Sequence, residues 1–190
     1  IPPDELFSTL LLGPYAPFCT ISFTLRRSVF DSVGLFNEEL PLSQDTEMWL
    51  RIAAVCRLIP GSIEEPVAVI RRHGHNRSRM DNPRFRAAAV DVYLSVLRWA
   101  RQRGLGPWYY RRLHRALALA VVGRRAPGAP LTVLREMMRR AAQATVRSPA
   151  VLPHLFGVFL RKALGRPLVP ERLRTGHTPA LDSARGPECL

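Results

Sequence analysis

The fold of this chain is decided around one stretch, Leu40-Pro-Leu-Ser-Gln-Asp-Thr-Glu-Met-Trp-Leu-Arg-Ile-Ala-Ala54. Either Ser43 or Asp45 can accept hydrogen bonds from the free N–H groups at the start of a helix. Beyond them, apolar residues recur at the three- and four-residue steps of one helical face, at Met48, Ile52, Val55 and Cys56. The stretch therefore predicts a helix that begins near Ser43 and carries a carboxylate in its first turn.

Two segments on either side of this helix favour β-strands. Residues Ile21-Ser-Phe-Thr-Leu25 alternate apolar with polar side chains, and Val67-Ala-Val-Ile70 is a short apolar run. Between the first strand and the predicted helix, Ser28-Val-Phe-Asp31 has the spacing of a short helix that Gly34 would end. We therefore expect residues 1–80 to form an α/β unit with a partial sheet.

Beyond Pro83, which suits the first turn of a helix, the pattern becomes purely helical. Apolar side chains at helical spacing predict four helices, within residues 83–103, 108–122, 134–145 and 152–163. We expect residues 83–165 to be a basic, all-α extension. Residues 166–190 are rich in Pro and Gly without periodicity, which predicts a disordered tail.

The net charge of +13 is unevenly distributed. Residues 1–70 hold four basic and nine acidic side chains, whereas residues 71–190 hold 24 basic and six acidic ones. Such asymmetry favours an anionic partner, either nucleic acid, a membrane surface or a phosphorylated substrate. Arginine makes up 27 of the 28 basic residues, which the codon bias of a GC-rich genome also produces, so both explanations stay open.

The chain carries no sign of secretion or of a spanning helix. Cys19, Cys56 and Cys189 lack the spacing of a zinc site or of a disulfide framework, which is typical of a reducing compartment. No apolar run reaches ~18 residues. The first residues, Ile1-Pro-Pro-Asp-Glu5, include neither an initiator Met nor a basic segment, so the start looks internal to a longer chain. We expect a cytoplasmic protein.

Residues 151–164 have the composition of a helix that lies in a membrane surface. Arg161 and Lys162 stand at the end of an apolar face made of Leu152, Leu155, Phe156, Phe159 and Ala163. This face predicts either a peripheral contact with the inner face of an anionic membrane or ordinary packing onto the preceding helices.

A resemblance to a known family rests on three motifs. Asp45 is followed by Trp49-Leu50-Arg51, Gly34-Leu-Phe-Asn-Glu-Glu39 lies upstream, and Arg71-x-His73-x-x-Asn76-x-Ser78 lies downstream. Together they resemble the acceptor half of the family 2 glycosyltransferases, over roughly residues 15–80. The resemblance implies the GT-A fold and an inverting transfer of a sugar from a nucleotide-sugar donor to a glycan or a lipid-linked acceptor.

The resemblance also implies roles for individual residues. Asp45 corresponds to the general base, which takes the proton of the acceptor hydroxyl. The family commonly has an acid before the base, whereas this chain has Gln44. Contacts to the diphosphate and the acceptor would come from Gln44 and from the strand-end residues Arg71, His73, Asn76 and Ser78.

Other parts of the family pattern are absent from this sequence. It contains no Asp-x-Asp, the motif that holds a divalent Mg or Mn ion in these enzymes, and no early βαβ unit for the nucleotide. We therefore expect a C-terminal fragment, inactive alone, of a parent enzyme that uses a divalent Mg or Mn ion. The Asp-x-Asp site for that ion is absent from this chain, in which we expect no metal ligand. The alternative is a non-enzymatic basic helical module that binds nucleic acid, in which Trp108-Tyr-Tyr-Arg-Arg112 would place aromatic rings beside arginines.

Overall fold

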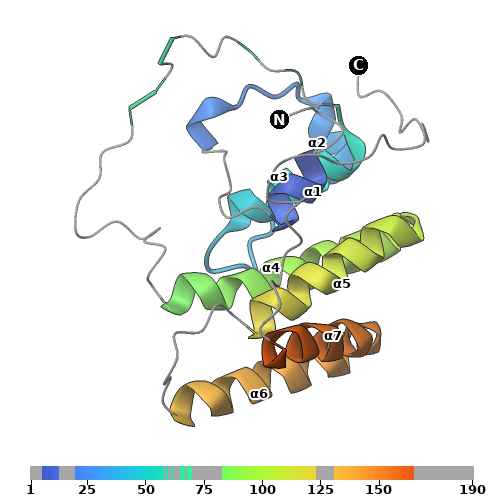
Figure 1. Cartoon of the computed structure of the whole chain (residues 1–190). Helices are drawn as coiled ribbons and strands as arrows, with labels where there is room; N and C mark the ends of the chain where they lie inside the picture. The colour runs from blue at the N-terminus through green and yellow to red at the C-terminus, as the bar shows by residue number, and fades with distance from the viewer. Residues whose placement is uncertain are drawn as a thin grey trace.

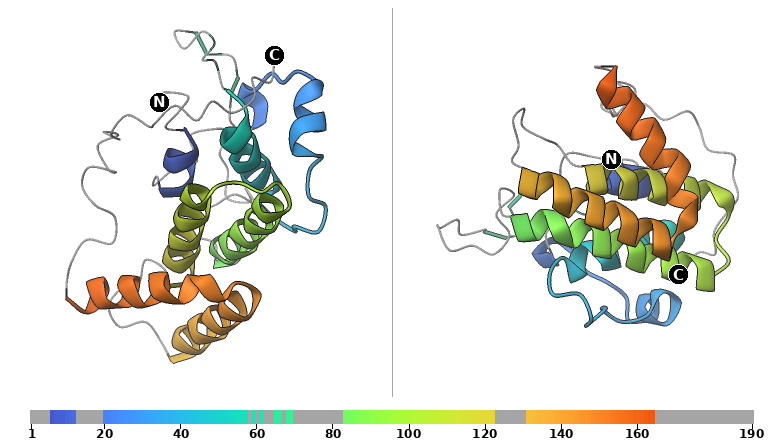
Figure 2. Two further views of the ribbon diagram at one scale, coloured as in Figure 1. Left: turned by 90° about the vertical axis from the view of Figure 1, so that its right-hand side faces the viewer. Right: turned by 90° about the horizontal axis from the view of Figure 1, so that it is seen from below.

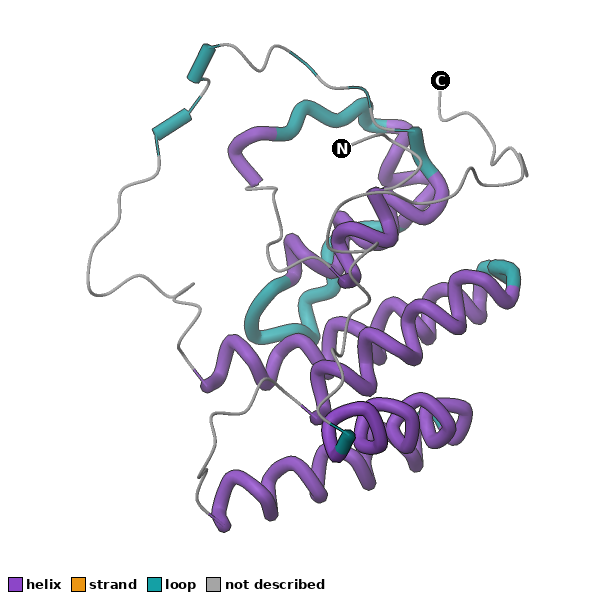
Figure 3. The backbone as a smooth tube through the Cα atoms, viewed as in Figure 1, coloured by secondary structure: helices purple, strands orange, loops and turns teal. Residues whose placement is uncertain are grey.

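The computed structural model describes residues 6–12, 20–57, 59, 61, 65, 66, 68, 69, 83–122 and 131–164. Within these residues every regular element is a helix, and no strand is present (Figure 3). The elements lie in three layers: α1 to α3 form one layer, α4 and α5 the middle layer, and α6 and α7 the third (Figure 1).

The predicted α/β unit within residues 1–80 was wrong as far as the chain is described. Where a strand was expected, the short 3-10 helix η2 covers Thr20–Ser22, and residues 23–26 have no regular structure. Ala68 and Val69 of the second expected strand are exposed and are not in a strand either. A strand needs a neighbouring strand for its backbone hydrogen bonds, and none lies among the described residues.

The first layer contains three helices, α1 (Leu6–Leu12), α2 (Ser28–Val33) and α3 (Gln44–Val55). Both helices predicted in this region, α2 and α3, are confirmed. Helix α2 ends at Gly34, whose φ of 85° is strained for residues that have a Cβ.

The four helices predicted beyond Pro83 are also confirmed. They are α4 (Pro83–Gln102), α5 (Pro107–Val122), α6 (Leu131–Arg147) and α7 (Leu152–Ala163), with a turn of 3-10 helix, η3 (Pro149–Val151), before the last. Gly104 has a φ of 67° and lets the chain reverse between α4 and α5. The tail 166–190, for which we expect disorder, lies outside the described residues. The division of the chain into units 1–80 and 83–165 stays a prediction.

The buried apolar side chains of the three layers form one core. Helices α4 and α5 pack against each other, α3 packs on α4, and α7 packs on α5 (Figures 1 and 2). The largest side chains with almost no exposed surface come from α3, α4 and α5, namely Met48, Leu50, Ile52, Leu97, Leu113 and Leu117. The core therefore holds the start of α3, where the predicted general base lies, in a fixed position relative to the middle layer.

None of the helices in the described segments combines the length and the apolar character needed to cross a membrane.

Candidate functional site

Asp45, the predicted general base, lies in the first turn of α3 and is partly exposed. Its Oδ1 accepts a hydrogen bond of 2.7 Å from the backbone N–H of Thr46, and the hydroxyl of Thr46 lies 3.4 Å from the same oxygen. The hydroxyl of Thr20 donates to Oδ2 at 3.3 Å. The carboxylate therefore caps a free amide of the helix and retains lone pairs for another donor.

Ser43, the other candidate cap, makes no capping hydrogen bond through its side chain. Its backbone is in the left-handed region, at φ 64°, which is uncommon for a residue with a Cβ. Gln44 turns back toward the preceding loop, where its Nε2 donates to the carbonyl oxygen of Leu40 at 2.5 Å. The Gln44 side chain therefore stabilises the turn that leads into α3.

Trp49 follows Asp45 by one turn of the helix, so the two side chains share a face. The Trp49 indole is buried and stacks on the ring of Phe23, with centroids 4.1 Å apart. Its Nε1 is buried without a hydrogen-bond partner in the described part of the chain. An unpaired buried donor costs free energy, and the described residues offer this N–H no acceptor. The Trp49 ring therefore packs in the core, against Phe23.

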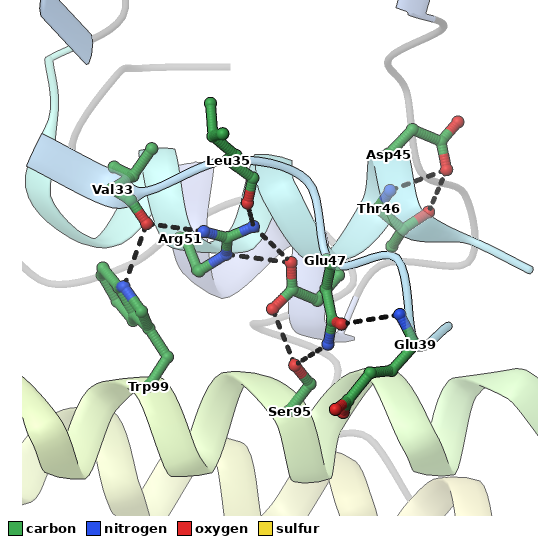
Figure 4. A network of polar contacts seen from close by, with 10 residues as sticks. Val33, Leu35, Glu39, Asp45, Thr46, Glu47, Arg51, Ser95 and Trp99 are labelled. Carbon is green, nitrogen blue, oxygen red and sulfur yellow. Dashed lines mark hydrogen bonds and ion pairs between the residues drawn. The ribbon is translucent and has the colours of Figure 1, made fainter. Parts of the chain in front are cut away.

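A buried ion pair anchors the body of α3. Arg51 binds Glu47 through Nε at 2.9 Å and through Nη2 at 2.7 Å, and both side chains are buried. Nη1 donates to the carbonyl oxygen of Val33 at 2.5 Å, and Nη2 also donates to that of Leu35 at 2.8 Å (Figure 4). Arg51 therefore joins α3 to the end of α2.

The same network reaches the middle layer. On α4, Ser95 donates from Oγ to Glu47 at 2.9 Å and lies 2.9 Å from the side-chain amide of Asn37. Trp99 donates from its indole to the carbonyl oxygen of Val33 at 3.1 Å (Figure 4). The sequence did not predict these partners on α4, because no local pattern links residues so far apart.

The four strand-end residues Arg71, His73, Asn76 and Ser78 lie outside the described residues. The structure therefore does not test whether they approach Asp45. Among the residues that are described, no group of three or more His, Cys, Asp or Glu side chains could hold a metal ion.

A second polar cluster joins α4, α5 and the start of η3. Arg101 donates to Ser148 Oγ at 2.8 Å, and this hydroxyl lies 2.8 Å from Nε2 of His114. His114 also stacks on His154 of α7, with centroids 5.9 Å apart. A hydroxyl beside an imidazole is the arrangement of a nucleophile and its base. However, Ser148 and His114 are both buried, so the cluster positions α7 rather than presenting a nucleophile.

The aromatic and basic segment at the start of α5 makes contacts within the protein. The Arg112 guanidinium lies 3.7 Å from the ring centroid of Trp108, and its Nε donates to Ser8 at 2.9 Å. Tyr109 and Tyr110 donate their hydroxyls to backbone carbonyl oxygens at 2.9 and 3.1 Å. Arg112 is partly buried, and these aromatic rings already pack against other parts of the protein.

Comparison with known proteins found no family model, no curated protein and no solved structure that matches this chain.

Proposed function

We propose that this chain supplies the acceptor side of an inverting glycosyltransferase, in which Asp45 is the general base. One observation carries the proposal: a partly exposed carboxylate stands at the first turn of a helix that is anchored from behind. The motif residues around it, Asp45 with Trp49-Leu50-Arg51, support the same assignment through the resemblance to family 2 glycosyltransferases.

In the proposed reaction, an acceptor hydroxyl donates a hydrogen bond to the Asp45 carboxylate. The hydroxyl oxygen attacks the anomeric carbon of the donor sugar as its proton passes to Asp45. The bond between the anomeric carbon and the diphosphate oxygen breaks, and the nucleoside diphosphate leaves with that electron pair. The new glycosidic bond therefore has the opposite configuration.

The anchor of α3 supports this role because a general base works only if it is held at hydrogen-bond distance from the proton it removes. Glu47 and Arg51 lie within two turns of Asp45 and are fixed to α2 and α4. Movement of Asp45 relative to the core would require this buried network to open.

Contacts to the diphosphate remain assigned to Arg71, His73, Asn76 and Ser78, with Gln44 holding the turn. The resemblance implies a divalent Mg or Mn ion in the parent enzyme, and the described residues of this chain include no group that could hold it.

The test replaces Asp45 by Asn in a protein that contains both this chain and a nucleotide-binding half. Turnover should fall by ~10²-fold or more while donor affinity is kept, because the amide cannot take the proton. The matched control is Asp31→Asn, which changes an exposed acid in the first turn of α2 and should leave turnover unchanged. If Asp45→Asn retains most of its turnover, Asp45 is only a helix cap.

A further inference from the structure

Helix α7 carries a row of large apolar side chains on its outer surface. Phe156 is 70% exposed, Leu152 52%, and Phe159 and Leu160 48% each. Leu152, Phe156, Phe159 and Ala163 follow one another at three- and four-residue steps, so they form one continuous face. We call this set, together with Leu160, the outer face of α7.

The opposite side of the same helix holds it to the protein. Leu155 and Val158 are buried and belong to the core cluster, and α7 packs on α5 and η3. His154 adds its stacking contact with His114. The packing of α7 therefore uses its inner side and leaves the outer face exposed.

The sequence of this helix is compatible with either a core face or a membrane face. The structure divides the predicted apolar face between them. Leu155 packs inward, whereas Leu152, Phe156, Phe159 and Ala163 face outward.

Basic side chains stand at one end of the outer face. Arg161 and Lys162 are both exposed and lie in the last turn of α7, where the apolar row ends. Over residues 131–164 the sequence has six basic residues and only one acid, Glu136. An apolar row with cations at its end is complementary to a surface that is apolar inside and anionic outside.

We propose that the outer face of α7 docks on an anionic lipid bilayer. The aromatic and leucine side chains enter the boundary between headgroups and acyl chains, and Arg161 and Lys162 contact lipid phosphates. A nucleic acid would engage the cations but would leave Phe156 and Leu152 in water. A lipid surface is therefore the occupant that accounts for both kinds of side chain.

This inference is independent of the proposed sugar transfer. The outer face belongs to α7 in the third layer, and Asp45 belongs to α3 in the first, with α4 and α5 between them (Figures 1 and 2). Lipid docking can fail while Asp45 remains a base, and the reverse also holds.

The experiment is vesicle flotation of the intact chain with phosphatidylglycerol-containing vesicles and with neutral phosphatidylcholine vesicles. The intact chain should float with the anionic vesicles. Phe156→Ser together with Phe159→Ser should weaken this binding by about tenfold or more, because two apolar side chains no longer leave water. Arg161→Gln and Lys162→Gln should each weaken binding to anionic vesicles by about fivefold, with little change on neutral ones.

The matched control is Leu35→Ser, because Leu35 is 76% exposed but follows α2 in the first layer. It should bind vesicles as the unchanged chain does. Circular dichroism should show that all variants keep their helices, and the single variant Phe156→Ser provides the milder change.

Three outcomes would overturn the proposal. The first is no flotation of the intact chain on anionic vesicles, or equal flotation of the Phe156→Ser/Phe159→Ser variant. The second is binding to duplex or single-stranded nucleic acid that needs Arg161 and Lys162 while vesicles are not bound. The third is a dimer in light scattering that the phenylalanine changes dissolve, which would assign the outer face to a second copy of this chain.

Discussion

Helices α3 and α7 have the same length, 12 residues, yet they treat charge and apolar surface in opposite ways. Helix α3 buries an ion pair, with the side chains of Arg51 and Glu47 only 5% and 2% exposed. Helix α7 leaves Phe156 and Leu152 in solvent and buries only its inner side. Each helix thus breaks the usual rule that charges lie outside and large apolar groups inside.

The two exceptions have different physical consequences. A buried ion pair is stable only while every partner is present, so α3 is fixed in one arrangement. An exposed apolar row has little effect on the free energy of folding, because water surrounds it in the unfolded chain as well. Binding to another surface that removes the row from water is favourable. Helix α3 is therefore held in one position, whereas α7 presents an apolar surface.

The largest expected effect follows from removing one half of the buried ion pair. Arg51→Met should lower the free energy of unfolding by ~3–5 kcal/mol, because Glu47 would remain as an unpaired buried charge. Urea denaturation measures the change.

Arg98→Met serves as the control for this first prediction. Arg98 faces Glu39 at 3.7 Å, and their side chains are 64% and 81% exposed. This exposed contact should contribute at most ~1 kcal/mol. Equal losses in the two variants would contradict the assignment of α3 as the anchored helix.

A smaller effect should separate the two sides of α7. Leu155→Ala should lower the free energy of unfolding by ~2–4 kcal/mol, because it leaves a cavity against α5. The neighbouring change Phe156→Ala should alter stability by only about 0.5 kcal/mol, because that ring is 70% exposed. Thermal or urea unfolding of the two variants compares them directly, and a large loss in Phe156→Ala would show that its ring is part of the core.

The smallest expected effect is a dependence of stability on pH at the base of α7. The pKa of His114 is lowered by burial first, and then by the charges of His154 and Arg101. The pKa of His154 is lowered by burial and by the charge of Arg115. In the unfolded chain both groups return to the ordinary pKa of 6.5. The unfolded state therefore binds more protons in mild acid, so stability is fully present above about pH 6.5 and is lost as the pH falls through the folded pKa values.

Melting temperatures measured between about pH 5 and 8 test this prediction. The variant His154→Gln removes one titrating group and one half of the repulsion, so its melting temperature should fall less steeply in acid. Identical slopes for the variant and the unchanged chain would mean that the two histidines do not carry the dependence.

The sequence predicted the helices because their signals are local. The apolar spacing of α4 and α5 and the turn at Gly104 are all contained within short windows. The alternation of Ile21, Phe23 and Leu25 is equally local, but a strand also needs a partner that no window contains. In the structure Phe23 stacks on Trp49 and Ile21 is 54% exposed, so the alternation reflects one packing contact rather than a sheet.

The candidate site was predictable to a similar degree. The motif identified Asp45, and the spacing of Glu47 and Arg51 by four residues is that of a helical ion pair. The contact of Thr20 with Asp45 spans 25 residues, and that of Ser95 with Glu47 spans 48. Such contacts depend on how the layers pack, which a single sequence does not encode in any local pattern.

The carbonyl oxygen of Val33 accepts hydrogen bonds from both Arg51 and Trp99, and so one backbone atom is shared by the end of α2, by α3 and by α4. Unwinding the last turn of α2 would leave two buried donors without an acceptor at once. Helix α2 has only six residues and would fray readily by itself. Bound in this way, it should open together with α3 and α4, so that hydrogen exchange in this short helix occurs at the rate of the whole unit.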